Sequence, residues 1–147
     1  NKFDLTPLMI AVVKNNIECV KHLLSIEGID VNAQDNTGMT PLMQAAISNN
    51  LSLCTELLNA NAKINMQNKI GITALMIAAG KGHLEFCKLL IDKGADTEIK
   101  DKSGNTVLQY AKNEEIRNLL RVSDIWYAAE HGTAQTLQKA FEKSTKK

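Results

Sequence analysis

Apolar residues recur at helical spacing in paired short segments, and the clearest pair lies between residues 68 and 100. A run of small and apolar residues at 74–79 is followed, after Gly82, by apolar positions at Leu84, Cys87, Leu90 and Ile91. Steps of three and four residues place these side chains on one face of a helix. The alanines of the first run let another helix approach closely. The pattern therefore predicts two short helices joined by a tight turn.

The same pattern returns along the chain at a nearly constant period. A threonine marks the equivalent position in each copy, with steps of 34, 33 and 33 residues between Thr6, Thr40, Thr73 and Thr106. A period of this length is typical of a repeat array, because one helix pair is too small to bury its own apolar side. We therefore expect residues 1–147 to form a single all-α domain of stacked helix–turn–helix units.

Turn and capping residues recur with the same period. Each unit begins with a turn such as Asp35–Gly38, whose glycine accepts a positive φ at little cost. The threonine that follows is a favourable N-cap, and Pro7 and Pro41 stand at the first helical position, where no N–H is needed. These signals predict where each first helix begins.

The period divides the chain into five segments. Residues 1–34, 35–67 and 68–100 are predicted to be full repeats, and 101–122 a fourth repeat whose first helix is shortened. Residues 123–147 are expected to be a degenerate helical pair that caps the array, with a helix starting after Ser123 and Asp124 and a disordered tail from Lys143. The first copy lacks a polar cap, which favours a fragment of a longer protein.

The recurring motifs resemble the ankyrin repeat. These motifs are Thr-Pro-Leu-Met-x-Ala-Ala from Thr40, Gly-His-Leu-Glu-x-Cys-Lys-Leu-Leu from Gly82, and Gly-Ala-Asp from Gly94. The resemblance covers residues 1 to about 122 well and residues 123–147 weakly. It implies an ankyrin-repeat solenoid with β-turn or hairpin connections that binds other proteins without catalysis. Methionine replaces the family's histidine at Met9, Met43 and Met76, where packing between copies is favoured over a soft binding strip.

The resemblance also implies that turn tips and the ends of first helices line a concave binding groove. On this basis six apolar side chains are expected to face solvent in one row, namely Phe3, Leu5, Met39, Ile47, Ile70 and Ile72. A basic rim is expected from Lys2, Lys14, Lys69, Lys81 and Lys102, with polar contacts from Asn36, Thr37, Ser48, Ser103 and Asn105. Such a surface suits a partner segment with apolar anchors and acidic flanks. Glutamate at positions 39 and 72 is expected to abolish binding without affecting the fold.

Composition narrows the possible functions. The chain is 44% hydrophobic and 22% charged, with a net charge of +1, so bulk charge points neither to nucleic acid nor to a membrane surface. No apolar run approaches the roughly 20 residues of a membrane span. Cys54 and Cys87 share one repeat position in second helices, which predicts buried, reduced thiols and an intracellular (cytoplasmic or nuclear) protein.

No arrangement of reactive residues suggests catalysis. The three histidines are scattered, no Cys-x-x-Cys is present, and no cysteine–histidine spacing fits zinc, so we expect no catalytic, metal or cofactor site. The leading hypothesis is a monomeric, non-catalytic module that binds another protein or a peptide. The alternative is the targeting or substrate-recruiting region of a larger enzyme or a secreted effector.

Overall fold

The computed structural model describes residues 2–145, apart from the side chain of Tyr127. The described residues form nine α-helices: α1 (Pro7–Val13), α2 (Ile17–Leu24), α3 (Pro41–Ser48), α4 (Leu51–Asn59), α5 (Ala74–Lys81), α6 (Leu84–Asp92), α7 (Val107–Tyr110), α8 (Glu114–His131) and α9 (Ala134–Thr145). The all-α architecture predicted from the sequence is therefore confirmed for this part of the chain.

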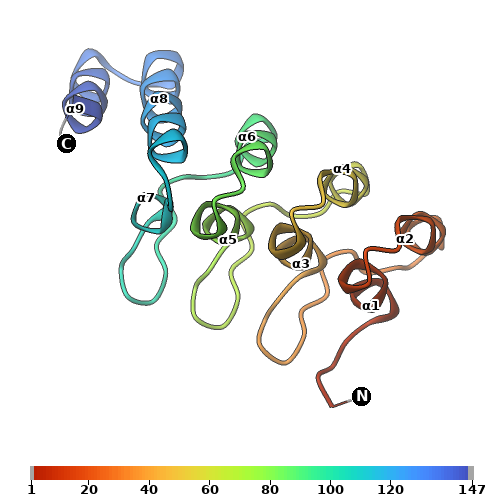
Figure 1. Ribbon diagram of the computed structural model, residues 1–147. Helices are drawn as coiled ribbons and strands as arrows, with labels where there is room; N and C mark the ends of the chain where they lie inside the picture. The colour runs from red at the N-terminus through yellow and green to blue at the C-terminus, as the bar shows by residue number, and fades with distance from the viewer. Residues whose placement is uncertain (1, 146–147) are drawn as a thin grey trace.

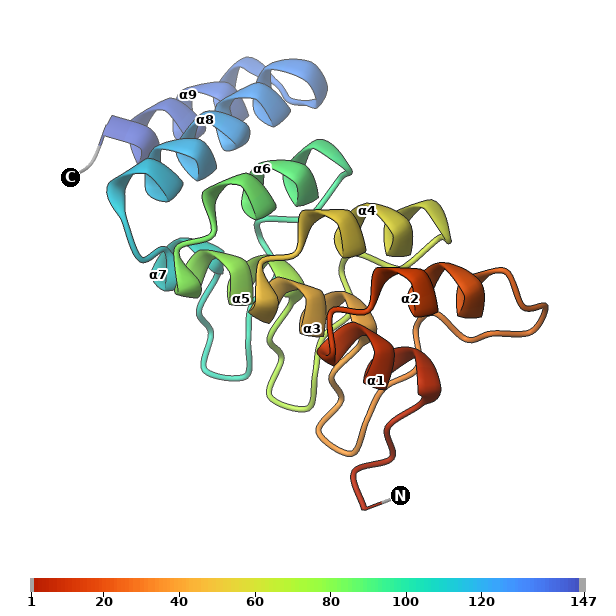
Figure 2. The same ribbon diagram turned by 45° about the vertical axis from the view of Figure 1, so that its right-hand side comes forward.

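The helices stack in two rows. The inner row consists of α1, α3, α5 and α7, the outer row of α2, α4, α6 and α8, and each helix packs against the next one in its row (Figure 1). Three hairpin loops, which we call fingers, extend in the same direction from the inner row (Figure 2). They comprise residues 35–39, 68–72 and 101–105, and residues 2–5 lie where a preceding finger would be.

The predicted threonine caps are present in the first three copies, whereas the Thr106 hydroxyl donates to the side-chain oxygen of Gln109 at 2.8 Å. The hydroxyl oxygens of Thr6, Thr40 and Thr73 accept hydrogen bonds from the backbone N–H three residues later, at 3.2, 3.3 and 3.3 Å. Pro7 and Pro41 occupy the first position of α1 and α3. The turns between paired helices use a left-handed residue in three copies, namely Asn15, Asn49 and Gly82. Local sequence signals therefore determine where the paired helices begin and end.

The core lies between the two rows. The alanine pair of α3 and that of α5 are fully buried, which lets neighbouring inner helices approach closely. Met9, Met43 and Met76 are at most 1% exposed, so the structure supports packing rather than a methionine binding strip. Cys54 and Cys87 are fully buried in the outer helices, and both are free thiols.

The helix break predicted before Ser123 is wrong. Helix α8 continues through this position, is 18 residues long and ends only at His131, with Gly132 as its C-cap. The Ser123 hydroxyl donates to the carbonyl of Leu120 at 2.8 Å, within the helix, instead of capping a new one. The Asp124 carboxylate faces other elements, since it accepts a hydrogen bond from Thr97 at 3.0 Å. Serine and aspartate are therefore accommodated inside a helix that no glycine or proline interrupts.

Helix α9 lies beside α8 and ends the array (Figure 1). It contains no buried residue. Lys143 attaches it by ion pairs to Asp124 at 3.5 Å and to Glu98 at 3.3 Å. The disorder predicted from Lys143 onward is wrong for residues 143–145, which belong to α9, and the prediction for Lys146 and Lys147 lies outside the described residues.

Candidate functional site

Each finger is a tight turn held by the first residue of its sequence. The Asp35 carboxylate accepts hydrogen bonds from the backbone N–H of Thr37 at 2.8 Å and of Met39 at 3.0 Å. Desolvation opposes the charge of Asp35, but the hydrogen bonds from the Thr37 side chain and the backbone outweigh it and lower its pKa. Asn68 accepts the equivalent bonds from Ile70 and Ile72 in the next finger. The fingers are therefore ordered turns.

The third finger has an additional support from α7. The hydroxyl of Tyr110 donates to the Asp101 carboxylate at 2.5 Å, and Asn105 donates to the same group through its backbone and its side chain. The Tyr110 bond is the largest cause that lowers the pKa of Asp101 to about 2, and the same bond raises the pKa of Tyr110 to about 12. This pair could not be predicted from the repeat pattern, because the other repeats carry Ile10, Gln44 and Ile77 at the tyrosine position.

Neighbouring fingers are joined at their tips by one backbone hydrogen bond each. The N–H groups of Asn36, Lys69 and Lys102 donate at 3.1 Å to the carbonyl of the preceding finger, at Phe3, Thr37 and Ile70. Glycine is required for this approach at Gly71, where a Cβ atom would stand 2.8 Å from the Cα of Asp101. Side chains add a second link, since the amide of Gln67 donates to the carbonyls of Gly71 and Lys100 at 2.8 and 2.9 Å.

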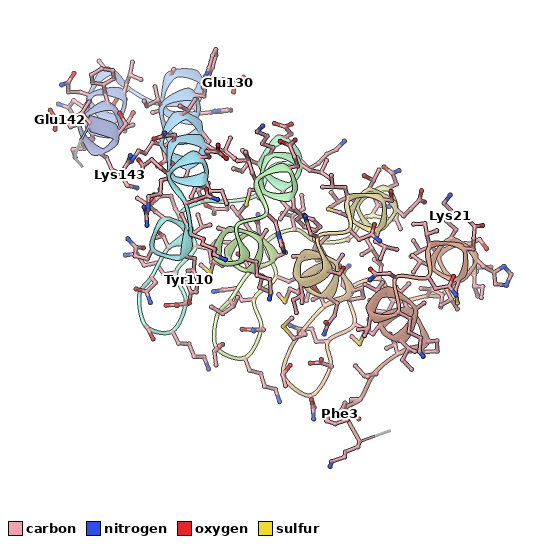
Figure 3. All side chains as sticks on the ribbon, in the orientation of Figure 1. Phe3, Lys21, Tyr110, Glu130, Glu142 and Lys143 are labelled. Carbon is pink, nitrogen blue, oxygen red and sulfur yellow. The ribbon has the colours of Figure 1, made fainter. Side chains whose placement is uncertain are left out.

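Most of the predicted binding residues fall into two exposed rows, which also include Val13 and Gly80. The finger row comprises the tip positions Phe3, Thr37, Ile70 and Ser103 together with the residues before them, Lys2, Asn36, Lys69 and Lys102. The helix-end row comprises Val13, Lys14, Ile47, Ser48, Gly80 and Lys81. All of these residues are exposed, and the apolar tips of the finger row, Phe3 and Ile70, are 54% and 62% exposed. Figure 3 shows Phe3 at the finger side and Lys21 on the opposite, outer side.

The single continuous apolar row predicted from the sequence is wrong. Leu5, Met39 and Ile72 are half-buried, because they lie at the base of their fingers, and Met39 and Ile72 pack against the core. Asn105, at the equivalent position, is also half-buried, and its side-chain amide donates to Asp101 at 3.2 Å. Glutamate at positions 39 and 72 would therefore place charge against the core and destabilise the fold, contrary to the prediction.

Charge is unevenly distributed between the two sides. Within the described residues, the inner row and its fingers (2–14, 35–48, 68–81 and 101–111) hold five lysines and three aspartates, whereas the rest hold ten lysines or arginines and thirteen acids. Two of the three aspartates, Asp35 and Asp101, are engaged inside their own fingers. The ion pairs of the described residues all lie outside the inner row, so its five lysines have no acidic partner there.

Other surface features offer little chemistry. A shallow hollow between α2 and α4 is lined mainly by polar residues, among them Lys21, Thr55 and Glu56. In residues 2–145 there is no group of three histidine, cysteine or acidic side chains arranged to hold a metal ion. None of the helices described here has the length and apolar character needed to cross a bilayer.

Comparison with known proteins identifies the repeats. The family described as "Ankyrin repeats (3 copies)" matches the chain twice, over residues 1–68 and over residues 42–125. A comparison with curated proteins found no match. The two family matches span most of the chain and coincide with the stacked helix pairs and fingers. The chain therefore belongs to the ankyrin-repeat family.

Proposed function

We propose that this chain is a non-catalytic module that binds a partner protein through the finger row and the helix-end row. Ankyrin repeats are in general protein–protein interaction modules. The observation that supports this surface in particular is the set of five lysines that have no ion pair within residues 2–145 and lie beside exposed apolar tips. A lysine that has no ion pair to break can bind a partner's carboxylate without losing an existing interaction. The surface is therefore electrostatically complementary to acidic residues.

The apolar residues of the two rows provide hydrophobic contacts in addition to those of the lysines. Phe3 and Ile70 project at the finger row, and Val13 and Ile47 are exposed at the helix-end row. Burying one large apolar side chain contributes about 1.5–3 kcal/mol, which is enough for a few anchors to determine affinity. We therefore infer a partner segment with apolar anchors flanked by acidic residues. Recruitment of a substrate within a larger enzyme, the alternative function, would use the same two rows.

The proposed surface is tested by reversing charge on one side of the molecule at a time. Lys69→Glu with Lys102→Glu alters the finger row, and Lys21→Glu with Lys63→Glu makes the same charge change at exposed positions outside it. In an affinity capture analysed by mass spectrometry, proteins retained by the wild type and by the second variant should be lost with the first. Equal loss with both variants, at unchanged circular dichroism and melting temperature, would show that the finger row is not the binding surface.

A further inference from the structure

We propose that the finger row binds an extended acidic peptide segment that crosses the fingers and carries two apolar side chains about six residues apart. This inference rests on the proposed function and specifies the form of the partner. The two apolar side chains contact Phe3 and Ile70, and an acidic residue two positions from each one, on the same face of the segment, meets Lys2 or Lys69. The segment between them passes over Thr37 and Asn36.

The spacing follows from the stacking of the repeats. Phe3 and Ile70 occupy the same position in fingers that are two repeats apart. Packed helices lie about 8–10 Å apart, so two repeats separate the tips by roughly 20 Å. An extended chain advances about 3.3 Å per residue, and about six residues therefore span that distance. The tip between them is Thr37, which has no large apolar side chain and whose hydroxyl donates to Asp35 at 2.7 Å.

The shape of the surface favours an extended segment over a helix. Exposed apolar tips form a line one residue wide, because the next positions inward, Met39 and Ile72, are half-buried against the core. A helix is about 10–12 Å across with its side chains and needs a groove of that width to bury one face. An extended chain contacts a narrow line with alternate side chains, which matches a row of single tips.

Charge pairs each apolar tip with its own cation. Lys2 precedes Phe3, with its ammonium nitrogen 5.7 Å from the centre of the phenyl ring, and Lys69 precedes Ile70. Lys102 extends the basic line to the third finger. None of these lysines has an ion pair among the described residues. An acidic peptide supplies both partners at once, whereas a single-stranded nucleic acid supplies negative charge without aliphatic side chains for Ile70.

Synthetic peptides provide the direct test. A fluorescein-labelled peptide with two Asp-Ser-Leu triplets, whose leucines stand six residues apart in a Gly/Ser background, is compared with peptides of equal composition whose leucines stand three or nine residues apart. Fluorescence anisotropy should show the tightest binding for the spacing of six, with an affinity that falls as salt rises. Ile70→Ser should lower the affinity for the peptide with a spacing of six about tenfold and abolish the preference for that spacing. Val122→Ser, at a position in α8 that is 51% exposed, is the matched control and should leave both unchanged.

The outcomes separate this inference from the proposed function. Equal affinity for the three spacings, a gain of helix in the bound peptide, or equal competition by an oligouridylate would overturn the extended acidic segment. If no peptide binds while affinity capture still depends on Lys69 and Lys102, the finger row remains the binding surface and only the form of the partner is wrong. If capture is also independent of these lysines, both proposals fail.

Discussion

At the scale of single residues, the pair formed by Asp101 and Tyr110 has the strongest electrostatic effect in the finger region. Three kinds of donor meet the carboxylate, namely a phenol, a side-chain amide and backbone N–H groups. Each stabilises the charged form, so the pKa of Asp101 lies at about 2 instead of 3.8. A carboxyl whose pKa is lowered by folding stabilises the protein above its unfolded pKa, and the stabilisation is lost as the pH falls from about 4 to about 2.

We predict that Tyr110→Phe raises the pKa of Asp101 from about 2 toward 3.8, because the largest cause of the shift is removed. Carboxyl carbon chemical shifts followed by NMR titration measure this directly. The free energy of unfolding of the variant should also fall less steeply between pH 4 and pH 2 than that of the wild type. An unchanged pKa would mean that the backbone and Asn105 hold the carboxylate without the tyrosine.

Glycines at the same finger position differ in what surrounds them. Gly71 and Gly104 both have a positive φ, of 86° and 83°. A Cβ atom at Gly71 would stand 2.8 Å from the backbone of the next finger, whereas one at Gly104 would meet nothing within 4 Å. We predict that Gly104→Ala costs about 1 kcal/mol, from φ alone. Gly71→Ala should cost about 3 kcal/mol, because overpacking adds to the strain. Urea unfolding of the two variants measures both costs, and equal losses would contradict the close approach of the fingers.

At the scale of the element, helix boundaries were predicted correctly where the residues that set them lie next to each other in the sequence. Helices α1 to α5 have side-chain caps from neighbouring residues, and α6 begins after His83 without one. The starts of the first helices and the breaks between paired helices were predicted correctly from such local signals. The length of α8 was not, because Ser123 and Asp124 favour a helix start in isolation. In the protein Asp124 is engaged by Thr97 and Lys143, which come from other parts of the chain. A local signal cannot report a partner that is distant in sequence.

Helix α9 is held differently from the helices of the array. It contributes no buried residue, and the ion pairs of Lys143 to Asp124 and Glu98 connect it to the rest. We predict that its amide hydrogens exchange faster than those of α3 and α5, whose alanine pairs are fully buried. Lys143→Ala should accelerate exchange in α9 and leave α3 and α5 unchanged. Exchange measured by mass spectrometry on peptic fragments tests this, and equal protection of α9 and α5 would contradict it.

At the scale of the whole molecule, the cysteines report on the stacking of the repeats. Cys19 is exposed, whereas Cys54 and Cys87 are fully buried. Burial raises the pKa of both buried thiols to about 12, which leaves almost no thiolate to react. We predict one thiol that reacts rapidly with a disulfide reagent in the native protein and two that react only as the array opens. Labelling followed by mass spectrometry identifies them, and rapid modification of Cys87 would contradict a closed stack.

The fold could be predicted from the sequence more completely than the binding surface. The regular spacing of the threonines predicts the repeat array, because every copy has the same pattern of capping, turn and apolar residues. The surface depends on which way each finger side chain turns, and Met39 and Ile72 turn inward although they are as apolar as Ile70. Composition could not show the charge distribution either, since the net charge of +1 for the whole chain does not reveal that the inner row and its fingers hold five lysines and only three aspartates. These properties arise only when the stack brings distant segments together.

The five lysines and three aspartates of the inner row and its fingers give this side of the molecule a net positive charge. A negatively charged neighbour is attracted more strongly by the finger side than by the rest of the molecule, so the molecule turns while the two are still apart. The field extends over about 8 Å at physiological ionic strength, which is enough to orient an approach before contact. More encounters then begin with the fingers in front, and the association rate rises without any change in the contacts of the final complex.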